Sequence, residues 1–192
     1  RFVNEAAPDF CGFVIGVPSS RRNVTAEQLG RLREYLADEI CPVGVFVNAD
    51  PVLAAGLLNS GVIQAAQLHG QEDEAYIRRL RGMTEGTLIK AFSVKSEADL
   101  KRAAECSADM VLLDHGKGGT GEKFDWELLD GWKERTGRPY ILAGGLSAEN
   151  IPSAIRKYDP WAVDLSSSVE TDGKKDREKI LAAVAAVRSV TK

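Results

Sequence analysis

Seven short apolar runs, separated by amphipathic stretches, constrain the fold of this chain more than any other feature of its sequence. Each run has four to seven residues and is continuous rather than alternating. Such runs are typical of strands that are buried on both faces, as in a parallel sheet covered by helices. The runs are Asp9–Ile15, Pro42–Val47, Ile63–Leu68, Thr87–Phe92, Met110–Asp114, Tyr140–Ala143 and Ala162–Leu165.

The stretches between the runs carry the signals of helices. Thr25 and Gln28 have the spacing of a capping box, and Asp50-Pro51 combines an N-cap residue with a proline at the first helical position. Near the end of the chain one helical stripe is formed by Ile180, Ala183, Val184 and Val187. A strand followed by a helix, repeated this regularly, predicts an α/β fold with right-handed crossovers.

The strand count favours a barrel. Arg1–Ala7 has the pattern of a helix end, and no strand precedes it in the sequence, so seven visible strands plus one make eight. We therefore expect residues 1–192 to form a single (βα)8 TIM-barrel domain that is incomplete at its N-terminus, with the first strand absent. A doubly wound open sheet is the alternative, but its usual GxGxxG turn does not occur here.

Composition narrows the class of protein. The net charge is −3 with no basic block, so we expect no nucleic-acid partner. No apolar run has the length of a membrane span and no signal peptide opens the sequence, so we expect a cytoplasmic protein that does not bind membranes. The cysteines Cys11, Cys41 and Cys106 are scattered, which argues against a disulfide framework or a structural zinc site. Cys11 lies mid-strand and is expected in the core.

Glycines and serines follow the last two predicted strands. Gly144-Gly145 offers backbone N–H groups free of side chains, and Ser166-Ser167 offers hydroxyls. Barrels commonly bind phosphate with the loops after strands seven and eight. The same residues also favour ordinary tight turns. Because both segments fall at these two strands, we favour a phosphate site.

Four other polar residues lie at or near predicted strand ends. Asp114 ends an apolar strand, where a partly buried carboxyl group suits a general acid, although it could equally cap the next loop. Arg22 could clamp an anionic group of a ligand, or simply lie in a solvated basic turn beside Arg21. His69 is more typical of a loop hydrogen bond than of a catalyst. Lys90, within a strand, is either structural or substrate-binding.

Several segments together resemble the phosphoribosylanthranilate isomerase family. The likeness covers nearly the whole chain, in order, and GVFVN, QLHG and GGTGxxFDW are specific as a set. The segments are Gly12-Phe13-Val14, Ser20-Arg21-Arg22, Val43–Asn48, Gln67-Leu68-His69-Gly70, Leu112-Leu113-Asp114, Gly118-Gly119-Thr120-Gly121, Phe124-Asp125-Trp126, Ala143-Gly144-Gly145-Leu146 and Asp164-Leu165-Ser166-Ser167.

The resemblance implies an Amadori rearrangement of N-(5-phosphoribosyl)anthranilate, a sugar phosphate, to 1-(2-carboxyphenylamino)-1-deoxyribulose 5-phosphate. Asp114 matches the family's general acid, and Arg22 matches the arginine that engages the anthranilate carboxylate. His69 and the phosphate cradle of Gly144, Gly145, Ser166 and Ser167 complete the implied substrate site. The family needs no metal or organic cofactor, and we expect a monomer or homodimer.

One part of the family's pattern is missing. Its general base is a cysteine at the end of the first strand, and none of the three cysteines present matches that position. Ser168 also stands where the family more often has glycine. A non-catalytic phosphate-binding barrel, or an inactive fragment without the base, is therefore the alternative function. Indole-glycerol-phosphate synthase and the dual histidine/tryptophan isomerase fit the sequence less well.

Overall fold

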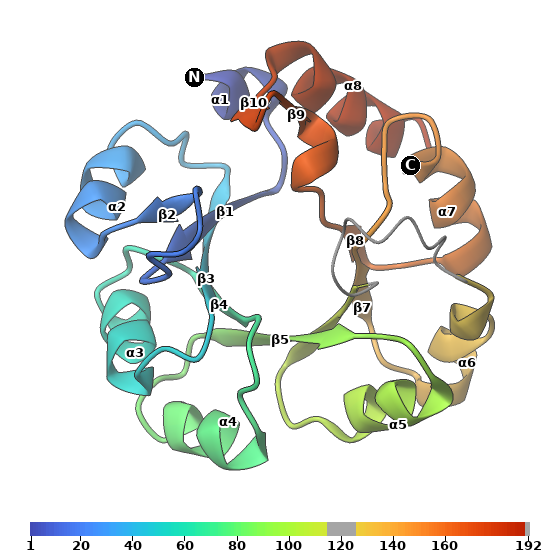
Figure 1. Ribbon diagram of the computed structural model, residues 1–192, viewed down its shortest axis with the longest axis horizontal. Coiled ribbons are helices and arrows are strands. Elements are labelled where there is room, and N and C mark those ends of the chain that lie inside the picture. Colours follow the sequence, from blue (N-terminus) through green and yellow to red (C-terminus); the bar gives the residue numbers. More distant parts are fainter. Residues whose placement is uncertain (115–125, 191–192) are drawn as a thin grey trace.

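The computed structural model describes residues 1–114 and 126–190 of the chain. Its main element is an eight-stranded parallel sheet in the order β2-β1-β3-β4-β5-β6-β7-β8, which curves into a ring with the helices outside it (Figure 1). An α/β fold was predicted and is confirmed. The predicted solvent-exposed loop residues His115 and Lys117, the glycine-rich stretch Gly116–Gly121, for which we expect mobility, and Phe124-Asp125 lie outside the described residues.

Seven of the strands coincide with the predicted apolar runs to within two residues at either end. The eighth, β2, has two residues and pairs with the end of β1; a strand so short leaves no periodic signal in the sequence. The strands are β1 (Phe10–Ile15), β2 (Asn23–Val24), β3 (Cys41–Phe46), β4 (Ala65–Leu68), β5 (Thr87–Ser93), β6 (Met110–Asp114), β7 (Tyr140–Leu142) and β8 (Ala162–Val163).

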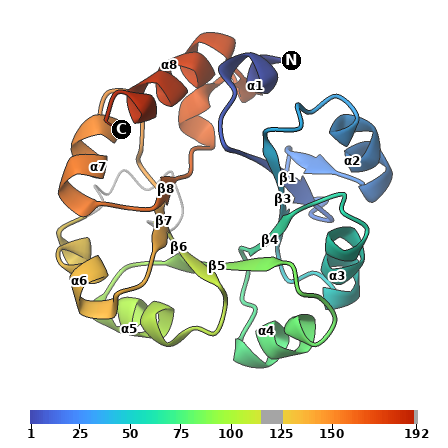
Figure 2. The same cartoon turned by 180° about the vertical axis from the view of Figure 1, so that it is seen from behind.

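Helices connect the strands and cover the outer face of the sheet (Figures 1 and 2). The predicted capping box of Thr25 and Gln28 and the Asp50 N-cap before Pro51 are both confirmed. The elements are α1 (Phe2–Ala6), α2 (Ala26–Arg33), α3 (Pro51–Asn59), α4 (Glu74–Arg81), α5 (Glu97–Glu105), α6 (Trp132–Thr136), α7 (Ile151–Tyr158) and α8 (Arg177–Arg188), with 3-10 turns η1 (Trp126–Leu129) and η2 (Ser167–Val169).

A hairpin of β9 (Glu170–Thr171) and β10 (Lys174–Lys175) was not predicted. Its turn consists of Asp172 and Gly173, with φ angles of 50° and 74°. An Asp-Gly pair with both residues in the left-handed region is a favoured two-residue hairpin turn, so the signal was present in the sequence. The hairpin places Glu170 and Lys175 beside the loop that follows β8.

The sheet does not close into a complete barrel over the described residues. β8 pairs with β7 and β1 pairs with β2 and β3, and no pairing joins β8 to β1. The expected burial of every strand on both faces is therefore wrong for β1 and β8, whose residues are mostly half-exposed because they border this seam. Outside the seam, α1 and α8 lie side by side, joined by the ion pair of Arg177 with Glu5 (Figure 2).

Two layers of apolar side chains form the core. The larger one lies between the sheet and the helices and includes Ile180 and Ala183 of the predicted α8 stripe, with Val184 and Val187 packed at its margin. The smaller layer lines the inside of the ring with aliphatic side chains, namely Val43, Ala65, Ile89, Ala91, Leu112, Ile141 and Ala143. This layer leaves a cavity on the concave face of the sheet.

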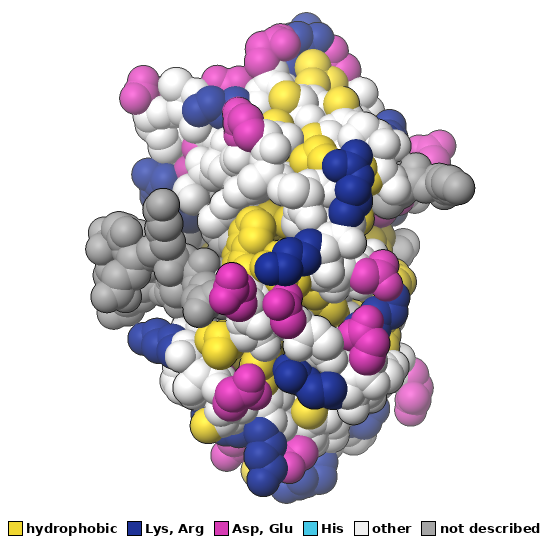
Figure 3. Space-filling model, turned by 90° about the vertical axis from the view of Figure 1, so that its right-hand side faces the viewer, with side chains coloured by type: hydrophobic (Ala, Val, Ile, Leu, Met, Phe, Trp, Pro, Cys, Tyr) yellow, Lys and Arg dark blue, Asp and Glu magenta, His cyan; other side chains and the backbone are white. Residues whose placement is uncertain are grey.

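The charges on the face shown in Figure 3 are of both signs and interspersed. The described helices are all too short or too polar to cross a bilayer.

Candidate active site

A cavity of about 1790 Å³ occupies the concave side of the sheet and extends through the seam between β8 and β1 to residues of α1 and α8. It extends from residues near the amino ends of the strands, such as Cys41 and Trp161, to the loops at their carboxyl ends. All seven predicted site residues line it: Arg22, His69, Asp114, Gly144, Gly145, Ser166 and Ser167. The parallel topology explains this convergence, because the carboxyl ends of parallel strands meet at one edge.

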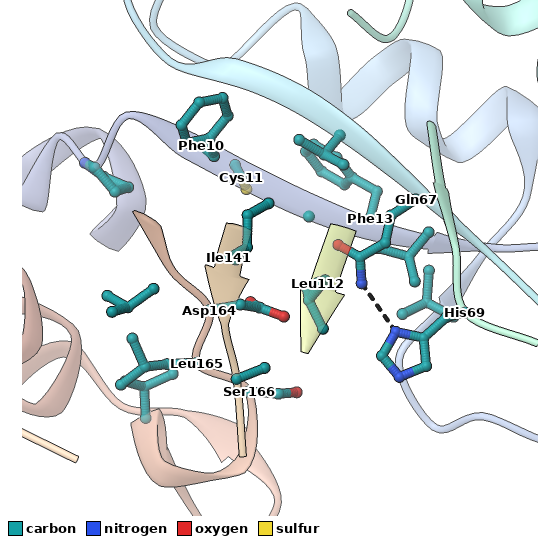
Figure 4. Close-up of a pocket in the computed structure, with 18 of the residues that line it drawn as sticks. Phe10, Cys11, Phe13, Gln67, His69, Leu112, Ile141, Asp164, Leu165 and Ser166 are labelled. Carbon is teal, nitrogen blue, oxygen red and sulfur yellow. Dashed lines mark hydrogen bonds between the residues drawn. The ribbon is translucent and has the colours of Figure 1, made fainter. Parts of the chain in front are cut away.

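His69 and Asp114 face each other at that edge. His69 follows the last residue of β4 and Asp114 ends β6, and His69 Nε2 lies 3.8 Å from Asp114 Oδ2. The other ring nitrogen, Nδ1, lies 2.9 Å from Nε2 of Gln67, a largely buried side chain that was not predicted to be in the site (Figure 4). An amide nitrogen only donates, so this contact places the proton of a neutral His69 on Nε2, facing Asp114.

Asp164 is a further carboxyl group in the site, missed by the sequence analysis. Its side chain points into the cavity beside Leu112 and Ile141 (Figure 4). Burial away from water raises the pKa of Asp164, and the negative charge of Asp114 raises it further, against the opposing effects of His69 and Lys175. The signal was available, because Asp164 lies in an apolar strand end just as Asp114 does.

Of the two interpretations given for Lys90, structural or substrate-binding, its contacts fit the structural one. Its ammonium group is buried and donates to the carbonyl oxygens of Leu68 and Gly70 and to Glu72 Oε2, the last at 3.0 Å. Glu72, which is fully buried, also accepts from the backbone N–H groups of Asn48 and Gly70. The pair thus ties the middle of β5 to the ends of β3 and β4 beneath the loop that carries His69.

Arg22 pairs with Glu170 in two hydrogen bonds. Its Nε donates to Oε1 at 2.7 Å and its Nη2 to Oε2 at 2.8 Å. Arg21 and Lys175 contact the same carboxylate at 2.6 and 3.1 Å. The hydrogen bonds from Arg22, with those of Lys175 and the charges of both, lower the pKa of Glu170 to about 2. Neither of the two sequence-based alternatives for Arg22 included this carboxylate.

The predicted phosphate cradle lies on the opposite side of the seam. Gly144 and Gly145 have φ angles of 82° and 67°, which only glycine adopts without strain. Ser166 and Ser167 are exposed, and Ser168 is half-buried in the middle of η2. Lys175 donates to the carbonyl oxygen of Ser166 at 2.8 Å and so brings a positive charge to this loop, which the sequence analysis did not anticipate.

Cys11 corrects one expectation. It is half-exposed and lines the cavity instead of packing in the core (Figure 4), because the seam leaves that face of β1 uncovered. Burial raises the pKa of the Cys11 thiol. Among the described residues, no group of three or more His, Cys, Asp or Glu side chains is arranged to hold a metal ion.

A curved parallel α/β sheet with its polar side chains gathered at the carboxyl ends of the strands defines an enzyme of the barrel-like α/β class. The family model described as N-(5'phosphoribosyl)anthranilate (PRA) isomerase matches residues 4–186, and the chain belongs to this family.

Individual relatives agree with that assignment. The chain is 41% identical over 193 residues to an N-(5'-phosphoribosyl)anthranilate isomerase of Endomicrobium trichonymphae, covering 98% of this chain and 92% of the relative. It is 37% identical over 194 residues to that of Thermoanaerobacter sp. (strain X514), covering 99% and 92%.

Solved structures show the same likeness. The phosphoribosyl anthranilate isomerase of Thermotoga maritima matches with a TM-score of 0.84 and 35% identity, over 98% of this chain and 92% of that one. A phosphoribosyl anthranilate isomerase in complex with reduced 1-(o-carboxyphenylamino)-1-deoxyribulose 5-phosphate matches with a TM-score of 0.82 and 34% identity, over 98% and 91%.

Proposed function

We propose that this chain catalyses the Amadori rearrangement of N-(5-phosphoribosyl)anthranilate to 1-(2-carboxyphenylamino)-1-deoxyribulose 5-phosphate. The observation that carries the proposal is the shared cavity: a carboxyl group that faces a histidine at 3.8 Å, a guanidinium group and a glycine- and serine-rich cradle all line it. The substrate has matching groups, namely a reacting sugar between an aromatic carboxylate and a phosphate.

Asp114 is the proposed general acid. It protonates the furanose ring oxygen, the ring C–O bond breaks, and the nitrogen lone pair forms a protonated imine. A base then removes the C2 proton, and the electron pair moves onto the positively charged imine nitrogen to give a neutral enolamine. The enolamine gains a proton at C1 and loses its C2 hydroxyl proton to give the ketone. The substrate's own nitrogen accepts the electron pair, so the proposal requires no metal or organic cofactor.

The rest of the site is proposed to bind the substrate. Arg22 engages the anthranilate carboxylate through charge-assisted hydrogen bonds, and His69 lies beside the reacting sugar. Gly144, Gly145, Ser166 and Ser167 hold the phosphate. Ser168 adds a side chain within η2, where a backbone N–H would otherwise approach the phosphate more closely.

The proposed general base is a cysteine on a strand in the seam between β8 and β1. With a strand there, the sheet becomes a closed, single-domain (βα)8 barrel. Three features of the described part of the chain support this: the seam borders the cavity, β1 and β8 run parallel with no pairing between them there, and neither has a paired neighbour on that side along its amino half. The raised pKa of Cys11 disfavours its thiolate, which makes it a poor substitute.

The proposal also includes a cytoplasmic location, a monomer or homodimer, and no nucleic-acid partner. Among the similar structures are monomers generated from a dimeric phosphoribosylanthranilate isomerase of Thermotoga maritima, so both states are compatible with a related chain. Cys11, Cys41 and Cys106 are all free thiols, as a reducing compartment would keep them.

The test is a fluorescence assay of phosphoribosylanthranilate consumption on protein of recorded intact mass. Turnover is expected from a polypeptide whose mass includes a strand for the seam, and D114N is expected to lower kcat by about 10²–10⁴-fold. D38N is the matched control, because the Asp38 side chain is almost fully exposed. No turnover with the seam strand present would favour the alternative, a non-catalytic phosphate-binding barrel.

A further inference from the structure

Glu170 is a carboxylate whose role neither the family resemblance nor the proposed reaction assigns. We infer that Glu170 is a positioning residue for substrate recognition: it holds the Arg22 guanidinium side-on, so that the free end of that group receives the aromatic carboxylate. This inference rests on the proposed function and deepens it.

The geometry of the Arg22 pairing is specific. Glu170 takes the edge formed by Nε and Nη2, with both of its oxygens engaged at 2.7 and 2.8 Å. Nη1 and the second hydrogen of Nη2 lie outside this pairing. A guanidinium group has two edges that each match a carboxylate, and the edge formed by Nη1 and Nη2 is the second one. Within residues 1–114 and 126–190, the Arg22 side-chain hydrogen bonds are the two to Glu170, and Arg22 lines the cavity, so the second edge is the one that we assign to a ligand.

Burial makes Glu170 a fixed support for Arg22. The Glu170 side chain is 4% exposed, whereas that of Arg22 is 33% exposed. Arg21 adds a second anchor and packs against Gly173, where a Cβ atom would collide with its guanidinium group. A long arginine side chain loses rotamer freedom on binding, and a pre-formed pairing removes much of that cost before the ligand arrives.

The charges around Glu170 favour an anion. Three cations, on Arg21, Arg22 and Lys175, contact one carboxylate, so the cluster carries an excess of positive charge. A single arginine paired with Glu170 would form a neutral pair, and Glu170 would then compete with the substrate. Because three cations surround the one carboxylate, the cluster keeps a net positive charge and attracts a second carboxylate.

Glu170 also links the two proposed ends of the substrate site. It binds Arg22 from the loop after β1, and through Lys175 it is connected to the carbonyl of Ser166 in the phosphate cradle after β8. These loops lie on opposite sides of the seam. The cluster therefore holds the carboxylate-binding and phosphate-binding groups at a fixed distance from each other. A site with this distance fixed favours ligands whose carboxylate and phosphate are the same distance apart.

The test compares two ligands on E170Q and the unmodified protein. The first is reduced 1-(o-carboxyphenylamino)-1-deoxyribulose 5-phosphate, and the second is its phenylamino analogue without the carboxyl group. Calorimetric titration is expected to show affinity for the first ligand falling by about tenfold or more, as for a lost charge-assisted contact, and affinity for the second changing by less than about twofold. E178Q is the matched control, because the Glu178 side chain is mostly exposed and pairs with Arg177 outside the cavity.

A merely structural role would weaken both ligands equally, and that result would overturn the inference. Unchanged binding of the carboxylate ligand to E170Q would also overturn it. Tighter binding would overturn it as well, because it would show that Glu170 competes with the ligand carboxylate for Arg22. If the unmodified protein bound neither ligand and turned over no substrate, the proposed function itself would fail. Should E170Q not fold, as judged by circular dichroism, E170D retains the charge but shortens the reach, and the same carboxylate-selective loss is expected.

Discussion

Gln67 Nε2 lies 2.9 Å from Nδ1 of His69, and the other ring nitrogen of His69 points toward Asp114. The amide thereby decides which nitrogen of the neutral ring carries the proton. Nε2–H then faces Asp114, so a proton donor is directed at the carboxylate that we propose as the general acid. The contact with Gln67 therefore orients the His69 ring toward Asp114.

The tautomer of His69 can be measured directly. We expect long-range ¹H–¹⁵N NMR spectra at pH 8 to show His69 in the Nε2–H form, and Q67L to shift the ring toward a mixture of tautomers because the donor to Nδ1 is lost. The chain has two histidines, so H115N assigns the signals. An Nδ1–H ring in the unmodified protein would contradict the prediction.

The buried Lys90–Glu72 pair predicts a large loss of stability in E72Q. Removing one partner leaves the Lys90 ammonium group uncompensated in a buried position, which typically costs about 3–5 kcal/mol. Urea unfolding measures this difference. The control is E27Q, which breaks the exposed pair with Arg31 and should change stability by less than about 1 kcal/mol. Equal effects of the two substitutions would show that the buried pair is not a tie between strands.

Asp164 predicts a pH-dependent effect of D164N. The folded-state pKa of Asp164 is raised, so its protonated form stabilises the fold; this stability is present below the ordinary value of 3.8 and is lost as pH rises through the folded-state pKa. Asparagine resembles the protonated acid at every pH. D164N should therefore gain about 1–3 kcal/mol over the unmodified protein at pH 7.5 and little at pH 3. Chemical unfolding at both pH values tests this, and a difference independent of pH would refute it.

Gly145 in the cradle and Gly30 in α2 predict opposite results for two alanine substitutions. At Gly145 a Cβ would meet no atom within 4 Å, but φ is 67°, so G145A should cost about 1 kcal/mol from backbone strain alone. It should also weaken binding of inorganic phosphate. Gly30 lies inside α2 with equally open surroundings and ordinary dihedrals, so G30A should stabilise by about 0.5–1 kcal/mol. Thermal unfolding compares the two; a stabilised G145A would show that the left-handed turn is not required.

The strand and helix pattern was available from the sequence because it depends on local chemistry. Hydrophobic period, caps such as Thr25 with Gln28, and the Asp50-Pro51 start are decided by residues a few positions apart. Parallel topology then places every strand's carboxyl end at one edge. That rule alone predicts that Arg22, His69 and Asp114, which lie far apart in the chain, line the same cavity.

Only the tertiary structure decided which side chains pair there. Glu170 contacts Arg22 across 148 positions, and Lys90 contacts Glu72 across 18. Such pairings depend on the curvature of the sheet and on how closely β8 approaches β1. Both quantities are the sum of small twists over all the strands, so they leave no periodic pattern in the sequence. The same geometry explains why Cys11 lines the cavity, although the sequence predicted that it would lie in the core. The sequence by itself determined the elements and the edge where the chemistry lies, whereas the partners of each charged group followed from long-range packing.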